Sequence, residues 1–300
     1  MPCALMYYRY AALWETFFGE LGCEIVKSGT SDQQMFSHGD SLSDSECCLP
    51  VKGFVGHVAR LAGRCDFVLV PRFERLGKND EFCVRFWGLT DIVRATFPGL
   101  NVLSYNLQGH KSGSEMRGLF GIGGVLGKSR AQCLLAYHRG KTAQQQTDAK
   151  AIKAQRRVLE EPGLKILIAA QPYIAHDPVI GGGLLGILRG QGAVPIFADR
   201  CKRAACKSES KQITSSLYWV MNKEVVGAIE LLRDQVDGVI LISAFPCGTD
   251  SLVNELVLRR VKGLPITQII LDGQQGDAGL QTRIECFLDI AKERKRSHAS

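Results

Sequence analysis

The chain has 300 residues, of which 45% are hydrophobic, and its formal net charge is +7. This length is enough for about two domains with apolar cores. No apolar run is long enough to span a bilayer, and the first residues lack the pattern of a secretion signal, so we expect a cytoplasmic protein without membrane contact.

Positive charge gathers in three stretches, "KAIKAQRRVLEE", "DRCKRAACKSESK" and "AKERKRSHAS". No aromatic residues alternate with these basic residues in the way that is typical of nucleic-acid-binding surfaces. We therefore interpret the stretches as solvated helix faces and a basic tail, and we predict no nucleic-acid partner.

The first half alternates strand and helix patterns. We predict strands at residues 3–8, 23–28, 66–72 and 101–107, with helices at 11–22, 54–63 and 86–97. Residues 112–161 break this rhythm with a glycine-rich stretch and a long polar helical pattern from Ser129 to Glu161. The second half resumes the alternation, with strands at 164–173, 194–199, 237–243 and 266–272 and helices at 184–192, 216–235, 250–263 and 278–297.

Strands separated by helices of this length predict parallel pairing through right-handed crossovers. The fold class is therefore α/β, with two doubly wound, Rossmann- or flavodoxin-like parallel-sheet domains that face a cleft. We predict an N-terminal α/β lobe over residues 1–111, a helical connector over 112–161 and a C-terminal α/β lobe over 162–300.

Eleven cysteines are many for a cytoplasmic chain, and without a secretion signal we expect most to be small buried residues and not disulfides. Cys247 is different because it directly follows an apolar run and precedes a helical pattern. Cys48 and Cys83 also follow predicted strands. Strand exits of a parallel sheet line one edge, so these thiols can converge, and helix N-termini favour thiolates. Three thiolates suit zinc or an iron–sulfur cluster, and their spacing does not decide between the two.

Several segments resemble the 2-hydroxyacyl-CoA dehydratase superfamily, and more narrowly its activase-associated, double-cubane-cluster-related branch. They are "PCALMYYRYAALWETFFGELGCEIVKS", "ECCLPVKGFVGHV", "FVLVPRF", "FCVRFWGLTDIV", "LISAFPCGTDSLV" and "DAGLQTRIECFLD". The resemblance implies a cleft iron–sulfur cluster, [4Fe–4S] in the simplest case, held by Cys48, Cys83 and Cys247, with Cys47 as the substitute for Cys48. It also implies an ATP-dependent activase that delivers low-potential electrons.

Three protein ligands on a four-iron cube leave one iron without a cysteine, and this iron could take water, sulfide, an oxygen of a small-molecule substrate or a second cluster. The hypothesis is an anaerobic electron-transfer protein that acts as an iron–sulfur reductase or dehydratase-like component, with catalytic residues unassigned. Lys52, His176 and Arg283 are expected to line the cleft, and Asp250 is expected to be the N-cap of a helix.

Two alternatives stay open. The chain could be a non-catalytic cluster-carrying or scaffold subunit, or a flavodoxin-like small-molecule binder without a cluster, in which the cysteines are buried bystanders. A homodimer is also kept open as the assembly.

Overall fold

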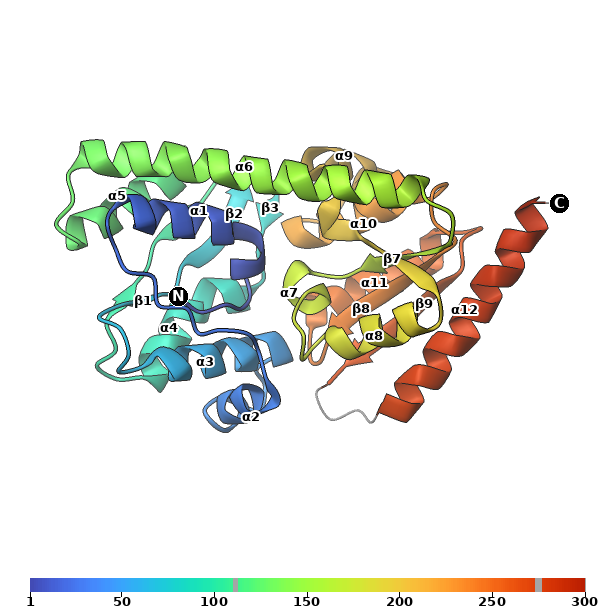
Figure 1. The fold of residues 1–300 in the computed structure, drawn as a ribbon, viewed down its shortest axis with the longest axis horizontal. Coiled ribbons are helices and arrows are strands. Elements are labelled where there is room, and N and C mark those ends of the chain that lie inside the picture. The colour runs from blue at the N-terminus through green and yellow to red at the C-terminus, as the bar shows by residue number, and fades with distance from the viewer. Residues whose placement is uncertain (110–112, 273–276, 300) are drawn as a thin grey trace. The chain divides into compact units, whose positions relative to one another are not determined.

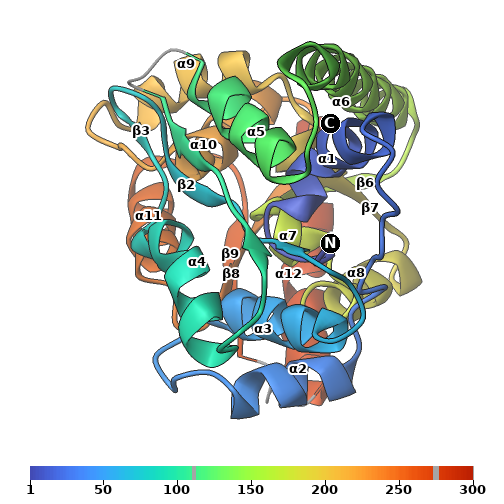
Figure 2. The same cartoon turned by 90° about the vertical axis from the view of Figure 1, so that its left-hand side faces the viewer.

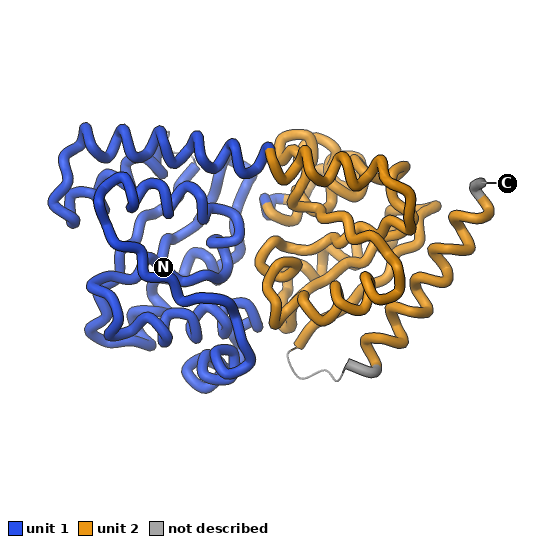
Figure 3. The backbone as a smooth tube through the Cα atoms, in the orientation of Figure 1, with its two compact units in different colours: residues 1–149, 218–220 blue, residues 150–217, 221–300 orange. Residues whose placement is uncertain are grey.

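The computed structural model describes residues 1–109, 113–272 and 277–299 (Figure 1). The chain divides into two compact units, which Figure 3 colours separately. Unit 1 is Met1–Ala149 with Tyr218–Val220, and unit 2 is Lys150–Leu217 with Met221–Ser300. The division falls within α6 (Arg130–Glu160), the long helix that the polar pattern predicted. None of the helices in the described part of the chain is both long and apolar enough to cross a membrane.

Unit 1 is a mixed α/β unit with short strands. β1 (Val68–Leu69) pairs in parallel with β4 (Val102–Leu103), while β2 (Arg72–Gly77) pairs in parallel with β5 (Asn106–Gln108) and antiparallel with β3 (Asp80–Glu81). Its helices are α1 (Tyr7–Glu20), α2 (Gln33–Ser41), α3 (Leu49–Leu61), α4 (Val84–Thr96), α5 (Ser114–Val125) and the first part of α6.

The predicted strands at 3–8 and 23–28 are wrong. Leu5 has a φ of 50°, which turns the chain out of an extended conformation before α1 begins. Residues 23–28 belong to no strand, although Ser28 N donates to Met1 O over 3.2 Å. The contacts between the two segments are too few to form a ladder.

The two other predicted strands of the first half each split in two. Pro71, which has no backbone N–H, separates β1 from β2, and Ser104 and Tyr105 separate β4 from β5. Each resulting strand is only two to six residues long, and the pairs belong to different sheets. A doubly wound lobe is therefore not confirmed for unit 1, and the expected cleft stays a prediction.

An aromatic cluster forms the core of unit 1. The ring of Phe73, which is 1% exposed, lies 5.5 Å from the ring of Tyr10 and 5.3 Å from that of Phe82. Phe86 of α4 contacts both phenylalanine rings. Burial of these large side chains fixes the first turn of α4 against β2, and Cys83 lies directly before that turn.

Unit 2 contains one fully parallel sheet with the strand order β7-β6-β8-β9. The strands are β6 (Leu164–Ala169), β7 (Ala193–Phe197), β8 (Gly238–Ala244) and β9 (Ile266–Leu271). The intervening helices are α7 (Pro172–Ala175), α8 (Gly182–Gly190), the 3-10 turn η1 (Ala198–Arg200), α9 (Arg203–Ile213), α10 (Val220–Leu232) and α11 (Gly248–Arg260), and α12 (Asp277–Ala299) follows β9.

The connections of this sheet run in opposite directions from β6, first to β7 and then across to β8. The crevice between the carboxyl ends of β6 and β8 is thus the topological switch point, where α/β sheets bind ligands. Each of the seven residues of β8 is buried, as the apolar run in the sequence predicted.

Glycines allow α2 to lie directly against α3, as Figures 1 and 2 show. A Cβ on Gly56 would lie 2.1 Å from the carbonyl oxygen of Met35, and a Cβ on Gly39 would lie 1.9 Å from that of Lys52. This backbone-to-backbone approach leaves no side chain that could move aside. The position of α3, which Cys48 precedes, therefore depends on these two glycines.

We predict that Gly56→Ala destabilises unit 1 by about 1–3 kcal/mol, because the added methyl group must separate the two helices. The control is Gly19→Ala in α1, where the new Cβ meets nothing within 4 Å. This control should leave stability equal or raise it by roughly 0.5–1 kcal/mol, since alanine favours helix over glycine. Denaturant unfolding measures both changes, and a Gly56→Ala protein as stable as the wild type would contradict the packing.

His57 of α3 is completely buried, and both of its ring nitrogens contact serine hydroxyls. Ser28 Oγ lies 2.7 Å from Nδ1, and Ser31 Oγ lies 3.0 Å from Nε2. Burial, together with the nearby Arg60 charge, lowers the pKa of His57 to about 4 from its usual 6.5. The histidine thus ties residues 28–31 to α3 in its neutral form.

The lowered pKa of His57 predicts a loss of stability in acid. Between pH 6.5 and 4 the unfolded chain takes up a proton at this histidine that the folded chain does not. The free energy of unfolding therefore decreases by about 3 kcal/mol as the pH falls through this window. Unfolding of wild type and of His57→Asn at several pH values measures the effect. The wild type should lose more stability than the variant over this range, and equal losses would show that His57 does not titrate as described.

Candidate functional site

Three cysteines occupy the same position relative to a helix. Cys48 is the N-cap of α3, Cys83 that of α4 and Cys247 that of α11, each with extended backbone. A residue at this position adjoins the first N–H groups of the helix, which have no intrahelical partners. These amides and the helix dipole stabilise negative charge on sulfur or on an anionic group that it binds.

Capping does not explain these thiols. Cysteine is not among the residues that favour the N-cap, and among the residues described none of the three side chains makes a regular capping hydrogen bond, although the Val51 N–H is close enough to the Cys48 thiol to lower its pKa. The start of α2 shows the usual arrangement, because the Asp32 carboxylate there accepts from Met35 N over 2.8 Å. Helix capping therefore gives no preference for cysteine at the three positions.

In unit 1, Arg85 connects the helix starts that Cys48 and Cys83 precede. It lies in the first turn of α4, and its Nη2 donates to Glu46 O over 2.7 Å. Its Nη1 donates to Cys47 Sγ over 3.8 Å. The arginine thus holds the segment before α3 against the start of α4 and brings positive charge to the cysteines.

The pKa of the Cys48 thiol reflects the proximity of these groups. The pKa of the Cys48 thiol is raised to about 11, chiefly by burial and also by the neighbouring Cys83 and Cys47. The Val51 N–H and the Arg85 charge act in the opposite direction. Without a metal, Cys48 is therefore a protonated thiol at neutral pH, and any metal that binds it must displace the proton.

Cys47 and Cys48 are adjacent in the chain but differ in burial and in their contacts. Cys47 is 2% exposed and its sulfur accepts from Arg85, whereas Cys48 is half-buried and is itself the N-cap. Cys48 therefore has the same local geometry as Cys83 and Cys247, and Cys47 does not.

In unit 2, Cys247 follows β8 at the carboxyl edge of the parallel sheet. Its Sγ lies 3.4 Å from Thr249 Oγ1, and the side chain is half-buried. A Cβ on the neighbouring Gly248 would meet nothing within 4 Å, so there is open space beside the first turn of α11. Cys247 thus lies at the switch-point edge with room for a bound group.

The three expected cleft residues all have partners within their own units. Lys52 Nζ forms an ion pair with Asp40 over 2.6 Å. His176 Nε2 lies 2.9 Å from Asp199 Oδ2, and its ring packs on Phe197. Exposed Arg283 donates from Nη2 to Gln268 O of β9 over 2.7 Å. A role for any of them toward a ligand stays a prediction.

The prediction that Asp250 is an N-cap is wrong, because α11 begins earlier, at Gly248, with Cys247 as its N-cap. Asp250 lies in the first turn and is 5% exposed. Its Oδ1 accepts from Asn222 Nδ2 over 2.7 Å and from Gln171 Nε2 over 3.3 Å. Sequence reasoning missed these contacts and Arg85, since each joins segments that are distant in the chain.

A groove of about 590 Å³ lies elsewhere in unit 1. Its walls include the apolar Phe18, Phe67 and Leu103 and the charged Glu24 and Arg64. This volume is in the range of small-molecule sites. None of the N-cap cysteines lines it.

Within the described residues, no group of three or more His, Cys, Asp or Glu side chains is arranged to hold a metal ion.

The sequence matches the family model described as CoA enzyme activase uncharacterised domain (DUF2229) over residues 1–200. The chain therefore belongs to this family, which agrees with the resemblance found in the sequence. No curated protein matches the chain. The matched range includes Cys48 and Cys83, and Cys247 lies beyond it.

We predict that Arg85→Ala loosens the segment before α3. Loss of a hydrogen bond that contributes about 1 kcal/mol should accelerate backbone hydrogen exchange at residues 44–50 roughly five-fold. Arg94→Ala is the matched control, because Arg94 lies exposed in the last turn of the same helix. Mass spectrometry of the exchanged peptides measures both variants, and equal exchange in the two would show that Arg85 does not hold this segment.

Proposed function

We propose that this chain is an iron–sulfur component of a CoA enzyme activase system. In this proposal Cys48, Cys83 and Cys247 bind an iron–sulfur cluster, [4Fe–4S] in the simplest case. The protein accepts low-potential electrons from an ATP-dependent activase and uses them to reduce or dehydrate a small substrate. The observation that carries the proposal is the shared N-cap position of the three cysteines.

The donor set suits such a group. Cysteine thiolates are the usual ligands of iron–sulfur clusters, and hydrogen bonds to sulfur and nearby charge tune the potential. Each cysteine here adjoins the amide end of a helix of 13 residues. Helix amides and the Arg85 guanidinium would offset the negative charge that thiolates and sulfides add. When bound, such a cluster supplies one-electron transfer.

The residues of this chain would bind and orient the cluster. Arg85 holds the segment that contains Cys47 and Cys48, and the aromatic core fixes the start of α4 behind Cys83. The buried Cys47 is kept as the substitute ligand for Cys48. Family membership supports the choice of partner, since the family description names a CoA enzyme activase.

A small-molecule binder without a cluster is the second candidate, and the groove of about 590 Å³ in unit 1 favours it. A cluster-carrying or scaffold subunit without activity of its own is a third. Anaerobic purification separates the second candidate from the others, because only a cluster protein contains iron and sulfide. Reoxidation of the reduced protein by added substrate would then favour an enzyme over a carrier.

We predict that serine at position 48, 83 or 247 removes most of the bound iron, because a hydroxyl is a poor ligand for iron–sulfur clusters. Cys286→Ser is the matched control, since Cys286 lies exposed on α12. Iron and sulfide are measured in anaerobically purified proteins, with circular dichroism to verify folding. Wild-type iron content in all three variants would refute the ligand assignment. Retention of iron in Cys48→Ser alone, with loss in Cys47→Ser, would assign that ligand to Cys47.

A further inference from the structure

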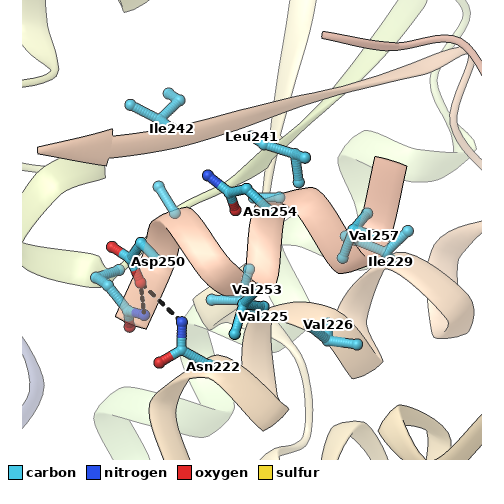
Figure 4. Close-up of a pocket in the computed structure, with 13 residues that line it drawn as sticks. Asn222, Val225, Val226, Ile229, Leu241, Ile242, Asp250, Val253, Asn254 and Val257 are labelled. Atoms are coloured by element: carbon cyan, nitrogen blue, oxygen red, sulfur yellow. Dashed lines mark hydrogen bonds between the residues drawn. The ribbon is translucent and has the colours of Figure 1, made fainter. Parts of the chain in front are cut away.

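A small polar cavity lies in the interior of unit 2, at the switch point of its sheet. It has a volume of about 10 Å³ and is lined by the end of β6, by β8 and by the facing sides of α10 and α11. Its polar wall consists of Gln171, Asn222, Asp250 and Asn254, and apolar side chains such as Val226 and Val253 form the rest (Figure 4). Each of the four polar residues is at least 94% buried.

The hydrogen bonds around this cavity are unevenly distributed. Oδ1 of Asp250 accepts from both Asn222 Nδ2 and Gln171 Nε2. Figure 4 marks the bond from Asn222 with a dashed line. Asp250 Oδ2 has no hydrogen-bond partner among the described residues, and the same holds for Gln171 Oε1 and Asn254 Nδ2. Buried polar atoms are rarely left unpaired, since each costs about 1–3 kcal/mol.

The three unpaired atoms are two acceptors and one donor. A water molecule can donate two hydrogen bonds and accept one or two, and it needs a cavity of roughly 10–15 Å³ with two to four polar partners. The cavity meets both conditions. A metal cation fits less well, because the Asn254 amide presents its N–H groups and Asp250 is the only carboxylate in the lining.

We propose that one buried water molecule occupies this cavity, donating hydrogen bonds to Gln171 Oε1 and Asp250 Oδ2 and accepting one from Asn254 Nδ2. The water then joins the exit of β6 to two successive turns of α11, because Asp250 and Asn254 are four residues apart on that helix. Through Asp250, the bridge extends to Asn222 of α10.

This bridge anchors the start of α11, and with it the N-cap Cys247. Burial raises the pKa of the Asp250 carboxyl group, and side-chain hydrogen bonds from Asn222, Gln171 and the Cys247 thiol act in the opposite direction. Asp250 and Asn254 are thus positioning residues for Cys247. The inference stands on the cavity and its unpaired atoms and does not require a cluster.

A high-resolution crystal structure of the intact chain tests the water directly. We expect one ordered solvent peak within hydrogen-bonding distance of Gln171 Oε1, Asp250 Oδ2 and Asn254 Nδ2. An empty cavity would overturn the proposal. A peak whose contacts and anomalous signal identify a metal ion would overturn it as well.

Variants test the anchoring role in protein freed of metal by a chelator. Asn254→Leu removes one partner of the water, and Asp250→Asn replaces the acceptor Oδ2 that faces the water by an N–H donor. Both changes nearly preserve side-chain size. We expect several-fold faster hydrogen exchange in the first turn of α11 and several-fold faster alkylation of Cys247 by iodoacetamide. Glu255→Gln is the matched control, because Glu255 is an exposed carboxylate on the same helix that pairs with Arg259.

The control should exchange and alkylate like the wild type. Wild-type rates in both test variants would overturn the anchoring role. If Asn254→Leu fails to fold, the rates of Asp250→Asn and the crystal structure of the wild type still test the proposed water and its anchoring role. Because both readouts use metal-free protein, their failure is distinct from a failure of the cluster proposal.

Discussion

The constraint on which the proposed site depends most is the N-cap position of its three cysteines, beside the amide end of a helix. An N-cap residue has extended backbone, so its side chain lies outside the helix beside N–H groups that have no intrahelical partners. Cys48, Cys83 and Cys247 each have this geometry without acting as hydrogen-bonding caps. Three repetitions in two units, at positions where serine or aspartate would be favoured, need a reason other than helix stability. Coordination of an anionic cluster, as proposed above, would supply that reason.

The two units position their cysteines by different means. In unit 1 the aromatic cluster around Phe73 fixes α4, the close contact at Gly56 fixes α3, and Arg85 joins the two helix starts. In unit 2 the parallel sheet positions the cysteine, because Cys247 follows β8 at the edge of the sheet that contains the switch point. Beneath it, Asp250 and the proposed water bind the first turns of α11 to β6. Packing thus constrains the first unit, and buried polar contacts constrain the second.

The second half of the fold was more predictable than the first, for physical reasons. A buried parallel strand is a continuous apolar run, and β8 shows this pattern clearly. The strands of unit 1 are short and interrupted, as at Pro71, so the sequence patterns there overestimated their length and placed strands at 3–8 and 23–28 that do not form. The sequence patterns located a helix after each of the three cysteines but placed its start too late, at 54, 86 and 250 where the helices begin at 49, 84 and 248. Arg85 and the contacts of Asp250 depend on tertiary packing, which no local pattern encodes, and the N-cap prediction for Asp250 failed because the N-cap is Cys247, three residues earlier.

The most direct test of the central claim is a crystal structure of the anaerobically purified, iron-containing protein, with iron located by anomalous scattering. The account predicts one iron–sulfur cluster bonded to the Sγ atoms of Cys48, Cys83 and Cys247. Iron bound only through cysteines that do not precede helices, or a correctly folded protein that takes up no iron under these conditions, would contradict it.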